Sequence, residues 1–327
     1  MMIQDFERQN WRQQSLEWPG VCRWLGLAVW VLGLSLVLSL GLSVGNGVAI
    51  AAPLAARISQ YPNWDTKPPV HPAQGDLHYP VWFEGTWDVA TTLVDLVAPL
   101  APDIVTPGFS GNQQFLNKAI PFQARFLPES PNRLGFPLRF PLQLQSPGRS
   151  PKRSPKIVAD RAFNGLNLAK AYFSDDASEG SRLIRAVKVD PQNPNRQITL
   201  LRGDRQLVST ITSRAVESPS AHEFVTTEVA QQEFRGAPQM YFNTVETTTA
   251  YQLNNAHPAQ LGLGSLRDAP LIFGDQVTAV YLSPTDPDFF RAGDRPVALY
   301  RYRLEFFPAL PSIDVGALPP TAASSNP

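Results

Sequence analysis

The stretch Phe83-Glu84-Gly85-Thr86-Trp87-Asp88-Val89 decides the fold class, because its Gly-x-Trp group opens the first long segment with a strand pattern. That segment runs from Gly85 to Val97 and is closed by Pro99. One of its faces carries Trp87, Val89, Thr91 and Leu93. Alternation with a period of two is typical of a strand that buries one face. The segment therefore predicts a long strand with a buried tryptophan near its start.

Further segments with strand character follow along the chain. They are Ala119–Leu127, Leu183–Val189, Arg196–Leu201, Gln206–Val216, Glu223–Phe234, Tyr241–Leu253, Leu271–Leu282 and Val297–Phe307, and Ile157–Phe173 begins as a strand and continues as a short helix. Short connections without strand–helix alternation favour an antiparallel meander over a parallel α/β sheet. We expect an all-β fold, a closed antiparallel β-barrel of about 8–10 strands with a short helix and a proline-rich insertion. A two-sheet sandwich is the structural alternative.

The composition excludes some classes of protein. The chain has 327 residues, of which 43% are apolar, enough for a substantial core. Its 28 basic and 28 acidic residues balance, whereas a nucleic-acid-binding protein normally has a basic excess. We therefore expect no nucleic-acid partner. The single cysteine, Cys22, excludes an intramolecular disulfide.

The N-terminal residues 1–51 read as a signal peptide or a membrane anchor. Leu25 to Leu42 is a continuous apolar run, and Ala49-Ile50-Ala51 supplies the small residues of a cleavage site. An uncleaved run of this length spans a bilayer equally well. In either case the rest of the chain lies outside the cytoplasm, and a retained segment attaches it to the membrane.

The remaining chain divides by composition. Residues 52–79 form a proline-rich, extended lead-in, residues 80–309 form the barrel domain, and residues 310–327 form a disordered tail. Within the barrel domain, residues 128–156 are a basic, proline-rich insertion. This insertion is either a solvated loop or a docking loop for an anionic membrane surface.

Several segments resemble one protein family. They are Trp82–Val97, Ala159–Leu166, Asp190–Leu201, Gln206–Thr210 and Asn243–Tyr251. The family is an uncharacterised group from cyanobacteria and plastids, described as a domain of unknown function, and the likeness covers about Tyr61 to Phe307. The resemblance implies a thylakoid-lumenal or periplasmic setting. It supplies no reaction, so it carries over no catalytic residue.

The Gly-Thr-Trp start is similar to that of lipocalin-like (calycin-like) barrels. This resemblance implies that Gly85 and Trp87 close one end of the barrel. It also implies that an arginine of the last strand, Arg301 or Arg303, lies across the indole ring. Such a contact combines a packed aliphatic stem with a cation–π attraction and has a structural role.

A barrel of this size encloses one small ligand. From the strand alternation, the candidate lining residues are Tyr241, Val245, Tyr251, Tyr300 and Tyr302. The alternative, that the same side chains simply fill the core, stays open at each position.

No motif for catalysis or for a cofactor is present. The four histidines, His71, His78, His222 and His257, have no metal-binding spacing, so we expect neither a metal nor a cofactor. The sequence lacks a nucleophile elbow, a phosphate-binding glycine loop and a dinucleotide fingerprint. An enzyme acting on a lipid-like substrate inside the barrel is nevertheless kept as a third alternative.

Two functions lead. The first is a carrier, an exported barrel that binds a lipid, carotenoid, quinone or tetrapyrrole in an internal cavity of about 300–1,000 Å³. The second is a non-enzymatic accessory or assembly factor of photosynthetic membrane complexes, with a filled barrel and with membrane-complex subunits as partners.

Overall fold

The computed structural model describes residues 54–106, 108–129, 155–173, 183–236, 240–254 and 269–309. The strands are β1 (His71–Pro72), β2 (Gly85–Val97), β3 (Ala119–Pro128), β4 (Ile157–Ala159), β5 (Ile184–Asp190), β6 (Asn193–Leu201), β7 (Gln206–Ser220), β8 (Glu223–Arg235), β9 (Tyr241–Leu253), β10 (Ile272–Leu282) and β11 (Ala298–Pro308). The helices are α3 (Leu54–Ser59), α4 (Phe109–Asn112), α5 (Arg161–Phe173) and α7 (Phe289–Ala292), with the 3₁₀ turns η1 (Val81–Phe83) and η2 (Gln113–Phe115).

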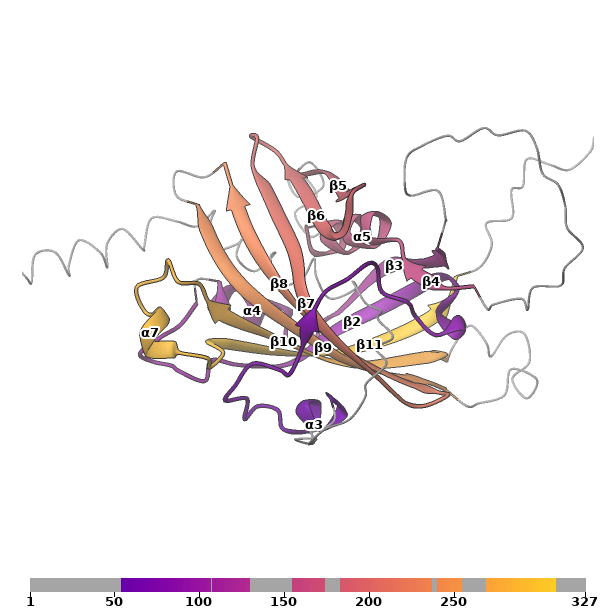
Figure 1. Cartoon of the computed structure of the whole chain (residues 1–327), viewed down its shortest axis with the longest axis horizontal. Helices are drawn as coiled ribbons and strands as arrows, with labels where there is room; N and C mark the ends of the chain where they lie inside the picture. Colours follow the sequence, from indigo (N-terminus) through magenta and orange to yellow (C-terminus); the bar gives the residue numbers. More distant parts are fainter. Residues whose placement is uncertain are drawn as a thin grey trace, which may run out of the picture.

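Ten of these strands form one antiparallel sheet in the order β4-β3-β2-β11-β10-β9-β8-β7-β6-β5. The sheet curls strongly, so that it has a concave and a convex face (Figure 1). The expected all-β, antiparallel class is confirmed. Strands β2 and β9 have the same bounds as the predicted strands, and each buries one face along most of its length.

The prediction of a closed barrel is wrong. The order of strands ends at β4 and β5, and these two are not paired with each other. Helix α5 lies in the gap, in contact with β3 on one side and β5 on the other (Figure 1). Strand β4 has only three residues, so most of β3 has no strand partner on that side. The result is a half-barrel whose open side is covered by a helix.

The lead-in is not extended throughout. Helix α3 forms because Leu54 and Ile58, one helical turn apart, both bury their side chains. After α3 the chain reaches the edge of β7, where β1 pairs with it at His71–Arg214 and Pro72–Ser213. It then enters the concave side. The lead-in therefore passes from the convex face, round the edge of β7, to the concave face.

Three of the predicted regions lie outside the described residues. They are the signal peptide or anchor (1–51), most of the basic insertion (130–154 of 128–156) and the tail (310–327). In the described part of the chain, no helix is both long and apolar enough to cross a membrane.

Candidate functional site

The five residues predicted to line a ligand site do share the concave face. Val245, Tyr251, Tyr300 and Tyr302 are buried, and Tyr241 is half-buried. They come from β9 and β11, with β10 between them. Tyr302 lies opposite Gln276 of β10, which lies opposite Thr249 of β9. The five residues therefore share one face of the sheet, and what covers this face decides whether it is a ligand site.

The chain itself covers much of the concave face. Leu77 and Tyr79 of the lead-in and Phe83 of η1 pack into the same apolar cluster as Tyr251 and Phe306. The rings of Tyr79 and Phe83 have their centroids 4.7 Å apart, and Phe83 meets Tyr251 edge to face at 5.1 Å. Leu77, Phe83 and Phe306 are 0% exposed. Side chains of the lead-in therefore fill one end of the half-barrel.

Two rows of polar side chains cross the middle of the concave face. They are Thr226, Thr249, Gln276 and Tyr302 in one row, and Glu228, Thr247, Thr278 and Tyr300 in the next. All eight are buried. Burial raises the pKa of Tyr300 to about 12, so its phenol stays protonated at neutral pH. The hydroxyl oxygens of Thr226, Thr247 and Thr278 have no hydrogen-bond partner among the described residues.

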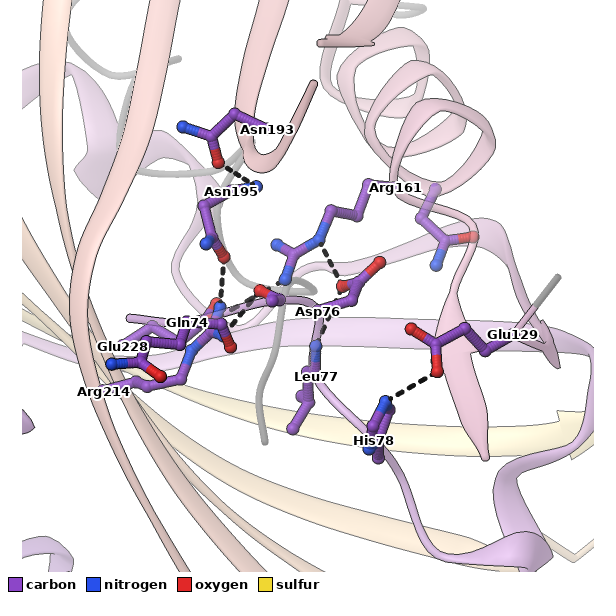
Figure 2. A network of polar contacts seen from close by, with 12 residues as sticks. Gln74, Asp76, Leu77, His78, Glu129, Arg161, Asn193, Asn195, Arg214 and Glu228 are labelled. Atoms are coloured by element: carbon purple, nitrogen blue, oxygen red, sulfur yellow. Dashed lines mark hydrogen bonds and ion pairs between the residues drawn. The ribbon is translucent and has the colours of Figure 1, made fainter. Parts of the chain in front are cut away.

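An internal ion network joins the lead-in to this polar region (Figure 2). Arg161 Nε, at the start of α5, donates to Asp76 Oδ1 at 3.2 Å. Arg214 Nη2, on β7, donates to Glu228 Oε1 at 2.9 Å, and Arg161 Nη2 lies 3.7 Å from the same oxygen. Arg214 Nη1 also donates to the backbone carbonyl of Gly75 at 3.1 Å. The network therefore fastens residues 75–76 to a helix and two strands.

The electrostatics of the network follow from burial. Burial raises the pKa of Glu228, an effect that the guanidiniums of Arg161 and Arg214 oppose. Burial lowers the pKa of Arg214. With two acids facing two guanidiniums, the network of Asp76, Arg161, Arg214 and Glu228 is neutral overall. The opposite charges compensate each other, as expected for an ion network with a structural role.

A second buried ion pair lies on the convex face, beneath the lead-in. Arg57 donates from Nε to Glu246 Oε1 at 2.6 Å and from Nη2 to Glu246 Oε2 at 2.8 Å. Tyr281 donates its hydroxyl to Glu246 Oε2 at 2.7 Å, and the Trp64 ring lies 4.1 Å from the Arg57 guanidinium carbon. Trp64 also packs on Val277, so the lead-in adds an apolar layer to this face.

Trp87 and the arginines of the last strand do not meet. Trp87 lies on the concave side, where Nε1 donates to the Phe83 carbonyl at 2.8 Å. Arg301 lies on the convex side and bonds Asp275 through two nitrogens, at 3.0 and 2.6 Å, while Arg303 pairs with Glu305 at 3.4 Å. The indole and the guanidiniums are on opposite faces, so the lipocalin-type closing contact is not made. Gly85 starts β2 with a φ of 127°, a conformation that favours glycine.

The convex face carries a groove of about 590 Å³. Its floor crosses strands β8 to β11, with Val225 opposite Ala250, Ala250 opposite Asp275, and Asp275 opposite Arg303. Phe273 lies beside this row, and Ala55 of α3 forms part of the wall. A second, more open hollow of about 640 Å³ lies where β2 and β3 meet α5.

No cluster of three metal-binding side chains occurs in the described ranges. His71, His78 and His222 lie apart along the chain, and His257 falls outside those ranges. His78 Nε2 lies 3.1 Å from Glu129 Oε2, and burial lowers the pKa of this histidine.

Neither the ion network around Glu228 nor the ion pair at Glu246 was predicted from the sequence. Arg214, Glu228 and Glu246 lie inside predicted strands, and Glu228 and Arg214 occupy positions that the alternation assigns to the concave face. A charged residue at a core-facing position is the signal that identifies such a pair. Its partners, Asp76 and Arg57, lie in the lead-in, and nothing local to them indicates burial.

Comparison with known proteins gives one match. A family model described as "Domain of unknown function (DUF6816)" matches residues 71–309. That range contains every strand of the sheet and α5, whereas α3 and Trp64 precede it. Neither a curated protein nor a solved structure matches the chain.

Proposed function

The chain belongs to the DUF6816 family, and from its structure we propose that it is a non-enzymatic accessory protein that acts through its outer surface. The observation that carries the proposal is the filling of the concave face by Leu77, Tyr79 and Phe83. A barrel that carries a ligand needs an internal cavity of about 300–1,000 Å³. In this half-barrel, side chains of the chain itself occupy one end of the corresponding space, which supports a role in which partners meet the outer surfaces.

The setting and the partners are part of the same proposal. The apolar run at Leu25–Leu42 supports a thylakoid-lumenal or periplasmic location, with subunits of photosynthetic membrane complexes as partners. The lack of a catalytic motif in the sequence supports a role without catalysis. A relation to lipocalins is supported by the Gly-Thr-Trp start and by the curled antiparallel sheet.

The basic insertion is the first surface to test, because the structure shows how to remove it cleanly. The Glu129 N–H donates to the Lys156 carbonyl at 2.7 Å, so the two ends of the insertion are already joined. Replacing residues 130–155 by a short Gly-Ser linker leaves β3 and β4 intact. We expect this variant to lose the membrane subunits that co-purify with the tagged full chain after gentle solubilisation, as measured by quantitative mass spectrometry.

The chain offers a matched control. The segment between β9 and β10 is also closed at its base, where the Asn254 N–H donates to the Leu271 carbonyl at 2.7 Å. A Gly-Ser replacement of residues 256–267 should leave co-purification unchanged. Equal recovery of subunits by both variants, or no specific subunit with the intact chain, contradicts the proposal.

A second candidate is carriage of a small apolar ligand, and the convex groove favours it. The groove volume of about 590 Å³ is in the range of known ligand sites. Native mass spectrometry and organic extraction of the protein from its own membranes or lumen test this directly. A stoichiometric small molecule supports carriage, and a protein of apo mass counts against it.

A further inference from the structure

The described chain begins at the wall of the convex groove. The Leu54 N–H donates to Glu217 Oε1 at 2.7 Å, which fixes the first residue of α3. The next residue, Ala55, lines the groove. Whatever precedes Leu54 is therefore attached beside this groove.

The length of the preceding chain limits how far the groove lies from a membrane. Leu42 ends the apolar run, and it precedes Leu54 by only twelve positions. Fully extended, those residues span at most about 40 Å. The run has enough residues to cross a bilayer. While the run is in a membrane, the groove stays within about 40 Å of the bilayer.

The chemistry of the groove suits an apolar chain. Val225, Ala250 and Phe273 supply its floor, and Phe273 is 37% exposed. Among its charged groups, Arg301 pairs with Asp275 and Arg303 with Glu305, and Glu223 adds a further acid to the lining. Because these pairs cancel one another's charge, the groove favours the hydrocarbon part of a ligand over an anion.

We propose that, in the chain that retains its leader, the convex groove holds an acyl chain of a membrane lipid. The inference rests on the second candidate function and names its ligand class. It requires the groove, the attachment of α3 and a retained leader, and it is independent of the accessory role.

Site-specific photocrosslinking tests the proposal. The full chain, with intact mass confirming the leader, is reconstituted in phospholipid nanodiscs with p-benzoylphenylalanine at position 273 or, as the control, at position 290. Phe290 is 90% exposed and lies in α7, away from the groove lining. We expect lipid adducts at position 273 at several times the frequency at position 290. In the unaltered chain, a lipid with a diazirine in its tail should label residues 250–252 and 273.

The outcomes separate the two claims. Lipid adducts no more frequent at position 273 than at 290, together with no tail labelling of the groove, overturn the lipid assignment. If extraction from native membranes yields a stoichiometric ligand of another class, carriage stands and the lipid assignment falls. If neither experiment finds a ligand, both fall.

Discussion

Arg57 places a guanidinium between the convex face of the sheet and Trp64. Its two bonds to Glu246 and one to the Thr66 carbonyl, at 2.7 Å, use most of its donors. The Glu246 side chain is fully buried, so without Arg57 its carboxylate has no cationic partner within the described residues. Removing one partner of a buried pair leaves an uncompensated charge and is far more costly than losing an exposed pair.

We therefore predict that Arg57→Ala lowers the free energy of unfolding by about 3–5 kcal/mol, measured by urea denaturation. Arg301→Ala is the control, because Arg301 and Asp275 are both partly exposed and their loss should cost within about 1 kcal/mol. Similar losses in the two variants contradict the burial argument for Arg57.

The buried tyrosines make the stability of the protein fall at alkaline pH. All eight have a raised pKa with burial as the largest cause, and for Tyr300 the value is about 12. A folded pKa above the unfolded value means that the unfolded chain releases its proton first. The stabilisation is thus fully present below pH 10, the unfolded value, and is lost as pH rises towards 12.

We expect the free energy of unfolding to fall steeply above pH 10. In Tyr300→Phe the slope between pH 10 and 12 should be smaller by about 1.4 kcal/mol per pH unit. Urea titrations at fixed pH measure the slope, and absorbance at 295 nm reports phenolate. Phenolate formation near pH 10 in the folded protein is the result that contradicts this prediction.

At the scale of elements, helix α5 supplies hydrogen-bond partners to the edge of β3, as a neighbouring strand does elsewhere in the sheet. Asn164 Oδ1 accepts from the Arg125 N–H at 2.6 Å, and Asn164 Nδ2 donates to the Arg125 carbonyl at 3.1 Å. The side-chain amide thus satisfies both backbone groups of one edge residue. Arg125 in turn packs its guanidinium on the Phe163 ring and bonds Asp160 at 2.6 Å.

Asn164→Ala should therefore destabilise the protein by about 1–3 kcal/mol, because it leaves the Arg125 N–H without a partner, whereas the Arg125 carbonyl keeps its bond from the Asp160 N–H at 2.9 Å. The control is Asn167→Ala on the same helix, where Nδ2 donates only to the Phe163 carbonyl within the helix itself. Hydrogen exchange should show loss of protection at the Arg125 amide in the first variant alone. Retained protection there means that α5 does not replace a strand.

Most strands can be predicted from the sequence because the burial of one face produces an alternation within the strand itself. The alternation of apolar and polar side chains in β2, β9 and β11 directly reflects one buried face. Tyr300 and Tyr302 share the concave face for the same reason. The partners of buried charges did not follow, since Glu246 and Arg57 are 189 positions apart. Pairing over such a distance leaves no periodic signal.

At the scale of the whole molecule, local sequence patterns predict neither whether the sheet closes into a barrel nor the path of the lead-in. Whether β4 meets β5 depends on the curl of ten strands together, and here α5 takes the intervening place. The proline-rich lead-in is predicted to be extended, yet it contributes Trp64 to the apolar layer of one face and Leu77 to that of the other. A segment fastened on both faces acts as part of the core.

This arrangement predicts that small changes in the lead-in weaken the whole domain. Leu77 is 0% exposed within the concave cluster, so Leu77→Ala should lower the free energy of unfolding by about 2–5 kcal/mol through lost packing and an internal cavity. Val81→Ala is the control, because Val81 is 56% exposed and its loss should change stability by no more than about 0.5 kcal/mol.

The same pair of variants bears on function. If the lead-in is a permanent filling, Leu77→Ala should leave co-purification of membrane subunits unchanged at a temperature where the variant stays folded. If residues 76–83 instead give way to a ligand, the variant should bind apolar dyes or extracted lipid in stoichiometric amount where the parent chain does not. Such binding would favour an internal carrier over a protein that acts through its surface, because the filled concave face is the observation that separates them.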